Sequence, residues 1–238
     1  EGTVDVSFMS SYELTKAGGY FYFCPQIIHD KLWRSDGTQE GTVKVKNFKK
    51  LGFTCITGNL TEFGPLLMFS LCYFSPSHSS DESALWKSDG TESGTVLVKQ
   101  IHPTDGAAIK SLTVAGGSLF FAAKQAETGY ELWKSDGSSD GTALLKDISP
   151  GTTSGNPENL FAWNDLLFFS AYTFEDGIEL WRSDGTEGGT FLLKNINPGG
   201  SFGVFGTGAG YDGLPSDFTP LGDSLFFTAY GGGGNYQI

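Results

Sequence analysis

The phrase Leu32-Trp33-Arg34-Ser35-Asp36-Gly37-Thr38 returns three more times along this chain of 238 residues. The later copies begin at Leu85, Leu132 and Leu180, with Lys or Arg after the tryptophan and with Ser138 in place of the final threonine in the third copy. Consecutive tryptophans of the four copies lie 53, 47 and 48 residues apart. A period in this range is typical of solenoids, propellers and arrays, in which one repeat cannot bury its apolar face alone. The repeated phrase therefore indicates a repeat architecture.

One repeat contains four short apolar segments, most clearly between Gly141 and Thr186. The segments cover residues 141–148, 159–163, 166–172 and 178–183. The stretches between them are rich in Gly, Pro, Ser and Asn, and Asp184-Gly185 is a strong tight-turn signal. Runs such as Leu167-Phe168-Phe169 are apolar on successive residues, which predicts strands covered on both faces. Four such strands are the content of one propeller blade.

The blade count follows from two signatures that each occur five times. Third-strand runs cover residues 20–23, 66–69, 119–122, 167–170 and 225–228. Gly-Thr strand openings stand at Gly2, Gly41, Gly94, Gly141 and Gly189. We predict a single all-β domain, a five-bladed β-propeller of four-stranded antiparallel blades. The repeat units are approximately 1–40, 41–93, 94–140, 141–188 and 189–238.

The two ends of the chain match complementary parts of one blade. Glu1-Gly2-Thr3-Val4 resembles the residues that follow each Ser-Asp-Gly-Thr turn, and the fifth Leu-Trp phrase would begin near Tyr236. We expect the N-terminal strand to complete the last blade, which would close the ring and remove its edges. Six to eight blades in a longer array remain the alternative.

The repeated phrase closely resembles the ELWxxDGT repeat family, found in secreted and cell-surface proteins and read as propeller-forming. The resemblance covers all five repeats and is strongest in the third and fourth. It implies a propeller fold and an extracellular, secreted setting, but no single established activity. In size and blade number the chain is also similar to the five-bladed tachylectin, an animal lectin, by architecture alone.

The composition of the chain limits the classes of partner that it can bind. A net charge of −12 and a pI near 4.5 would repel a nucleic-acid backbone, and no apolar run is long enough to span a membrane. Cys24, Cys55 and Cys72 allow one disulfide plus one thiol, or three small buried side chains, and the sequence leaves the pairing open. Asn59-Leu60-Thr61 is a glycosylation sequon, so the chain is a candidate glycoprotein.

Three sets of recurring residues could belong to a ligand site or to the scaffold. The aspartates of the phrase could bind calcium, but calcium needs about six to eight oxygen ligands and each phrase supplies one aspartate. We therefore expect these aspartates to stabilise turns: Asp36, Asp89, Asp136 and Asp184. The tryptophans could stack on sugar rings, but their mid-strand position beside Leu predicts a core role: Trp33, Trp86, Trp133 and Trp181. The first-strand lysines could contact an anionic ligand, but we expect pairing with strand carboxylates: Lys46, Lys99, Lys146 and Lys194.

Catalytic motifs are missing from the sequence. His29, His78 and His102 share no metal-ligand spacing, and there is no nucleophile elbow or Walker loop. We therefore expect no enzyme activity, no metal and no cofactor.

The binding face is predicted from loop variation. Loops between strands one and two, and between strands three and four, must emerge at one end of a blade, and they vary in length and content. Variable loops on a rigid scaffold usually carry recognition. The candidate ligand-binding residues on these loops are His102, Asp105, Tyr172, Phe174, Glu175, Asp176 and Tyr211.

These features together favour an extracellular recognition protein that binds carbohydrate, as a lectin does. One alternative is a structural or adhesive module that docks protein partners in a larger extracellular assembly. Another is a carrier of a small apolar ligand or pigment, suggested by the aromatic content of 14%. Expected partners are glycans or extracellular proteins, without nucleic acid and without membrane insertion.

Overall fold

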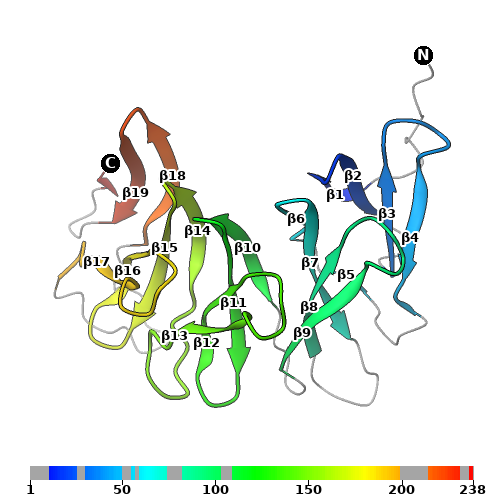
Figure 1. Cartoon of the computed structure of the whole chain (residues 1–238). Helices are drawn as coiled ribbons and strands as arrows, with labels where there is room; N and C mark the ends of the chain where they lie inside the picture. The colour runs from blue at the N-terminus through cyan, green and yellow to red at the C-terminus, as the bar shows by residue number, and fades with distance from the viewer. Residues whose placement is uncertain are drawn as a thin grey trace. The chain divides into compact units, whose positions relative to one another are not determined.

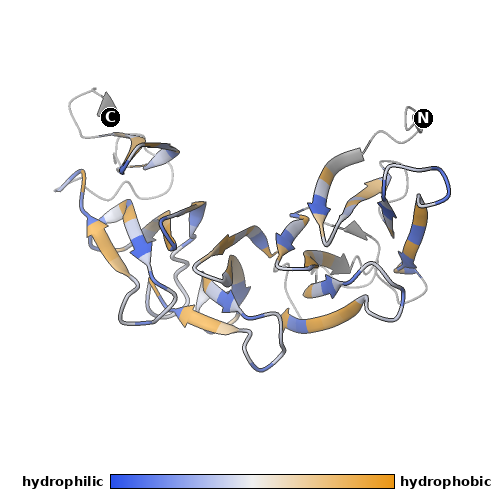
Figure 2. Cartoon of the chain, turned by 45° about the horizontal axis from the view of Figure 1, so that its top comes forward, coloured by the Kyte–Doolittle hydropathy of each residue, from blue (hydrophilic) through white to orange (hydrophobic). Residues whose placement is uncertain are grey.

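The computed structural model describes residues 11–25, 30–49, 55–56, 59–73, 82–102, 109–198, 214–230 and 236–237. Throughout these ranges the regular structure is β, and the strands form antiparallel sheets in chain order (Figure 1). Figure 2 shows hydrophobic residues concentrated in the strands and hydrophilic residues in the turns. No helix in this described part of the chain is long and apolar enough to cross a membrane.

The strands of the described ranges form five successive sheets. The first contains β1 (Ser11–Ala17), β2 (Tyr20–Pro25), β3 (Lys31–Ser35) and β4 (Val43–Asn47). The second contains β5 (Cys55–Ile56), β6 (Thr61–Phe63), β7 (Leu66–Tyr73), β8 (Glu82–Ser88) and β9 (Val96–His102). The third contains β10 (Lys110–Ala115), β11 (Ser118–Gln125), β12 (Gly129–Ser135) and β13 (Ala143–Lys146). The fourth contains β14 (Glu158–Trp163), β15 (Leu166–Thr173), β16 (Gly177–Ser183) and β17 (Phe191–Lys194). The fifth contains β18 (Ser216–Leu221), β19 (Ser224–Tyr230) and β20 (Tyr236–Gln237).

The chain divides into two compact units, which are described separately. The first unit comprises residues 1–114 and 137–142, and the second comprises residues 115–136 and 143–238. The strand predicted at the N-terminus lies outside the described residues, and so does its expected pairing with the last sheet.

The strand that opens each sequence repeat belongs to the sheet before it. In the third sheet, β13 pairs with β12, so that Trp133 lies opposite Leu144. The repeat pattern predicts that residues 141–148 share a sheet with the three strands that follow them, and the structure differs on this point. An Asp-Gly turn joins antiparallel neighbours, whereas the long loop 149–157 leads to the next sheet. Each Ser-Asp-Gly-Thr phrase is therefore a hairpin within a sheet.

Three of the four tryptophans of the phrase lie in the core, as predicted, and Trp33 is partly buried. The side chains of Trp86, Trp133 and Trp181 are only 5%, 3% and 7% exposed. Trp133 lies opposite Phe121, and their ring centroids are 6.2 Å apart in a stacked arrangement. Trp181 stacks on Phe169 in the same way, at 6.4 Å. Burial of this extent leaves no ring face available for a sugar.

The aspartates of the phrase hold the hairpin turn, which confirms the predicted role. Asp184 Oδ1 accepts hydrogen bonds from Thr186 N at 2.9 Å and from Thr186 Oγ1 at 2.7 Å. These bonds hold the pKa of Asp184 below its usual value. Gly185 has a φ of +87°, and a Cβ atom at Gly189 would collide with the Asp184 carboxyl group. Both glycines are therefore required by the turn. The turns at Asp36 and Asp89 have the same hydrogen bonds.

Two of the recurring lysines, Lys46 and Lys99, bind main-chain carbonyls, so the expected pairing with carboxylates is wrong for these two. Lys46 Nζ donates to Thr95 O at 2.6 Å, and Lys99 Nζ donates to Thr142 O at 2.7 Å. Carbonyls in a turn have no ladder partner and need another donor. Each lysine thus ties its sheet to the hairpin turn of the following phrase.

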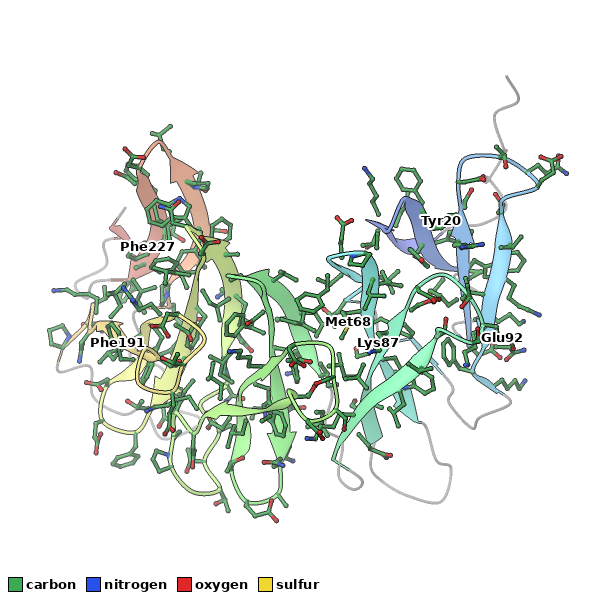
Figure 3. The ribbon with its side chains drawn as sticks, viewed as in Figure 1. Tyr20, Met68, Lys87, Glu92, Phe191 and Phe227 are labelled. Carbon is green, nitrogen blue, oxygen red and sulfur yellow. The ribbon has the colours of Figure 1, made fainter. Side chains whose placement is uncertain are left out.

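A second set of cations, one residue after the tryptophan, binds the same turns. Lys87 (Figure 3) donates to Gly137 O at 2.9 Å within the first unit. Lys134 donates to Gly185 O at 2.9 Å within the second unit. The recurring basic residues therefore join successive repeats.

Candidate functional site

The second unit contains a hollow of about 390 Å³ where the fourth sheet approaches β18. Strands β14 and β18 lie side by side there (Figure 1). The lining combines one carboxylate, two amides and two hydroxyls with two aliphatic side chains. These residues are Asn156, Glu158, Asn159, Ser170, Ile178, Leu214 and Ser216.

A hydrogen-bond chain fixes the polar wall of this hollow. Asn159 Nδ2 donates to Ser170 Oγ and to Pro215 O, both at 3.2 Å. Ser170 Oγ in turn donates to Glu158 O at 3.1 Å. The Asn159 amide thus connects the fourth sheet to the segment that leads into β18. Leu214 N completes the connection by donating to Ile178 O at 3.2 Å.

The backbone around the hollow is unusual. Asn156, Asn159 and Leu214 have φ values of +44°, +54° and +44°. The left-handed region is uncommon outside glycine and is tolerated best by Asn, so Leu214 is the most exceptional of the three. The ladder between β14 and β15 also shifts register between Glu158 and Phe161. The positive φ of Asn159 and this register shift recur in the last sheet, at Asp217 and between Ser216 and Thr219, so they belong to the scaffold. Leu214 is the strained residue that is particular to the hollow, and strained residues cluster at functional sites.

A buried carboxylate holds the loop that forms one edge of the hollow. Glu131 is fully buried and accepts hydrogen bonds from Ile148 N at 2.8 Å and Gly155 N at 2.6 Å. Ser149 N donates to it more weakly, at 3.4 Å. Gly155 directly precedes Asn156, whose N–H donates to Tyr130 O at 3.0 Å. Glu131 is therefore a positioning residue for the edge of the hollow.

Two opposing effects act on the Glu131 carboxyl. Burial raises its pKa to about 7, and the nearby charge of Asp147 also raises it. The three main-chain N–H groups act in the opposite direction, because they stabilise the ionised form. Glu179 occupies the same place in the next repeat, where it accepts from Ile196 N at 2.8 Å.

Residues from the predicted variable loops lie beside the hollow, since Asn156 belongs to the loop 149–157 and Ser170 and Ile178 flank the loop 173–177. In the second unit, Tyr172 N at the end of β15 donates to Gly155 O at 2.6 Å. This bond joins the two kinds of variable loop, as the blade topology predicted. Ser170 and Ile178 of the hollow come from the same hairpin as Tyr172.

Of the predicted ligand residues that the structure describes, none lines this hollow. Phe174 is 70% exposed, and Glu175 beside it is also exposed. Asp176 belongs to the local loop structure, since Asn195 Nδ2 donates to its Oδ1 at 2.8 Å. His102 ends β9 in the first unit, and its side chain lies outside the described part of the structure. Asp105 and Tyr211 also lie outside the described residues.

The residues that line the hollow were not among those predicted from the sequence. Asn156-Pro157 ends the variable loop and Glu158-Asn159 follows it, and the two asparagines suit left-handed positions, which was the available signal. The described residues contain no group of three or more His, Cys, Asp or Glu side chains placed to hold a metal ion.

No protein-family model matches the chain, and no curated protein matches it. The structure is similar to that of a mutant puromycin hydrolase complexed with PGG, with a TM-score of 0.50 and 11% identity. That match covers 91% of this chain and 33% of the hydrolase chain. Structures of two single-residue variants of an exo-β-1,3-galactanase from Phanerochaete chrysosporium, both with β-1,3-galactotriose, match with TM-scores of 0.40 and 8% identity. These matches cover 91% of this chain and 55% of the galactanase chain.

The chain thus spans between one third and about half of the solved chains it matches. At this identity the hydrolase likeness bears on the fold alone, and it supports a propeller-type arrangement of antiparallel sheets. The galactanase likeness is too distant to carry an argument.

Proposed function

We propose that this chain is an extracellular recognition protein that binds carbohydrate in the hollow between β14 and β18. The observation that carries the proposal is the lining, which places Glu158, Asn159 and Ser216 beside Ile178 and Leu214. Carboxylate, amide and hydroxyl groups supply both donors and acceptors for ligand hydroxyls. The aliphatic side chains supply the apolar contact that a sugar ring also offers.

The volume of the hollow and the charge of its surroundings restrict the class of sugar further. A hollow of about 390 Å³ lies at the small end of the usual range for ligand pockets. Among the described residues that line it there is no Lys, Arg or His, and the whole chain carries a net charge of −12. The site therefore favours neutral or amino sugars over uronic or sialic acids.

We propose binding without hydrolysis. Glycoside hydrolysis usually needs a pair of carboxyl groups on either side of the scissile bond. Among the described lining residues, Glu158 carries the single carboxylate. A lining of this composition can hold a sugar by hydrogen bonds, and its described residues include no second acid or base.

The extracellular setting is part of the same proposal. Its support is the repeat resemblance and the sequon at Asn59, which is partly exposed just before β6. Thr61 of the sequon donates its hydroxyl to Asn59 O at 3.1 Å.

A glycan array followed by calorimetry on the purified chain tests the proposal. We expect binding of neutral sugars, with a loss of affinity of about 5- to 150-fold in Glu158→Gln and in Asn159→Ala, because each change costs about 1–3 kcal/mol. Glu158→Gln replaces an accepting carboxylate oxygen with an amide nitrogen, and Asn159→Ala removes the side-chain amide. Glu187→Gln is the matched control, since Glu187 is an exposed residue of the turn between β16 and β17. Absence of binding at millimolar sugar, or equal affinity in all three variants, would refute the proposed site.

Docking of a protein partner is the second candidate function. The described outer strands expose apolar side chains: Leu97 of β9 is 46% exposed, and Phe191 of β17 (Figure 3) is 40% exposed. A stable partner in pull-down experiments, lost in Leu97→Ser and accompanied by no glycan binding, would favour this function. The polar lining of the hollow does not favour a carrier of an apolar ligand.

A further inference from the structure

Two of the three cysteines occupy directly opposed positions of one antiparallel ladder. Within the first unit, β5 pairs with β7 so that Cys55 is opposite Cys72 and Ile56 is opposite Leu71. The sequence left the pairing of the three cysteines open, and this register distinguishes among the possibilities.

Opposed positions of an antiparallel ladder meet the backbone requirement for a disulfide. Their Cα atoms lie about 4.5 or about 5.5 Å apart, depending on the hydrogen-bonding pattern. Disulfides usually join Cα atoms about 4.4–6.8 Å apart. Opposed residues also share one face of the sheet. We propose that Cys55 and Cys72 form a disulfide bond across β5 and β7, an inference that is independent of the proposed ligand.

A disulfide at this position would also stabilise the edge of the second sheet. The first edge of the second sheet is divided between β5, with two residues, and β6, with three. A two-residue strand forms few ladder hydrogen bonds, so a covalent link at Cys55 would hold it on β7. The closed loop of about 17 residues would also restrict the unfolded chain.

Cys24 has a different role in this proposal. It lies in β2, is 9% exposed and belongs to the core of the first unit. Its position follows the phenylalanine opposite the tryptophan, and Ser70, Ala122 and Ser170 occupy it in other repeats. All three of those residues are small and buried. The position thus selects a small packing residue, and Cys24 remains a thiol.

The chemistry is an ordinary thiol–disulfide exchange. The Cys55 and Cys72 thiols lose two protons and two electrons as the S–S bond forms. A small-molecule disulfide such as oxidised glutathione accepts the two electrons and two protons and becomes two thiols. This exchange goes to completion in an oxidising compartment.

The experiment uses the full chain, refolded in a mixture of reduced and oxidised glutathione. The protein is denatured without reductant in iodoacetamide, digested and mapped by mass spectrometry. We expect linked peptides that contain Cys55 and Cys72, and an alkylated peptide that contains Cys24. Reduction should lower the thermal midpoint by about 6–12 °C, from the usual loop-closure effect in a chain of this size.

Two variants make the result decisive. Cys24→Ser should keep both the link and the shift in thermal midpoint on reduction. Cys55→Ser combined with Cys72→Ser should melt like the reduced wild type and should not respond to reductant. Alkylation of all three cysteines in the cooperatively folded wild type, or a link that contains Cys24, would overturn the proposal. If the double variant does not fold, the mapping of the wild type and of Cys24→Ser still decides.

Discussion

Replacement of Glu131 by Gln tests whether burial or hydrogen bonding has the larger effect on the pKa of this carboxyl group, which positions the loop at the edge of the candidate site. The carboxyl is fully buried, and its pKa is raised from 4.5 to about 7, mainly because burial penalises the charged form. The substituted amide would keep the shape and remain neutral at every pH. It would also place an NH₂ group against one of the main-chain N–H donors, at a cost of about 1–3 kcal/mol.

The pH dependence follows from the direction of the pKa shift. Between pH 4.5 and 7 the folded chain holds a proton on Glu131 that the unfolded chain releases, so stability falls as the pH rises. A pKa that moves from 4.5 to about 7 corresponds to about 2.5 kcal/mol between pH 5 and pH 8. The wild type should therefore lose about this much stability relative to Glu131→Gln over that range, while most other titrating groups cancel in the difference.

The assay is urea unfolding of both proteins at pH 5, 6, 7 and 8, with Glu187→Gln as a control for the loss of one negative charge. The stability difference between wild type and Glu131→Gln should decrease steadily with pH. A difference that stays constant within about 0.5 kcal/mol, or one that increases with pH, would show that the N–H groups of Ile148 and Gly155 outweigh burial. Either result would refute the reasoning.

Three further predictions concern the scaffold. Gly189→Ala should lower the free energy of unfolding by about 1–2 kcal/mol in urea, because the new Cβ displaces Asp184 from Thr186. Gly188→Ala is the control: its Cβ meets open space, so it should change the free energy of unfolding by less than about 0.5 kcal/mol. Trp133→Ala should cost about 3–5 kcal/mol by urea unfolding because it removes a buried ring stacked on Phe121, and a loss below about 1 kcal/mol would contradict its place in the core. Lys46→Met should lower the free energy of unfolding by about 1 kcal/mol, because it removes the donor to Thr95 O. The same change at the exposed Lys44 should be neutral. Equal thermal midpoints for the two variants would exclude a stabilising role for the bond from Lys46.

The sequence by itself determined the features that depend on neighbours in the chain. Asp184, Gly185 and Thr186 form a turn whose hydrogen bonds span two residues, so the phrase alone predicts its geometry. The apolar runs and the tryptophans likewise predicted buried strands and their core, because successive side chains of a strand point to opposite faces and an unbroken apolar run makes both faces apolar. The number of sheets followed from counting these local signals.

Tertiary structure decided everything that depends on which distant segments meet. The assignment of each Gly-Thr strand to the preceding sheet, the carbonyl partners of Lys46 and Lys99, and the opposition of Cys55 and Cys72 come from pairing that composition does not encode. The hollow shows the same limit, because Asn159 reaches Pro215 across 56 residues of sequence. Glu131 looked like an ordinary strand residue, and it became a buried anchor only because a loop 24 residues away folds over it. A hydrogen bond between distant segments requires both to arrive at one place, and only the folded chain specifies that place.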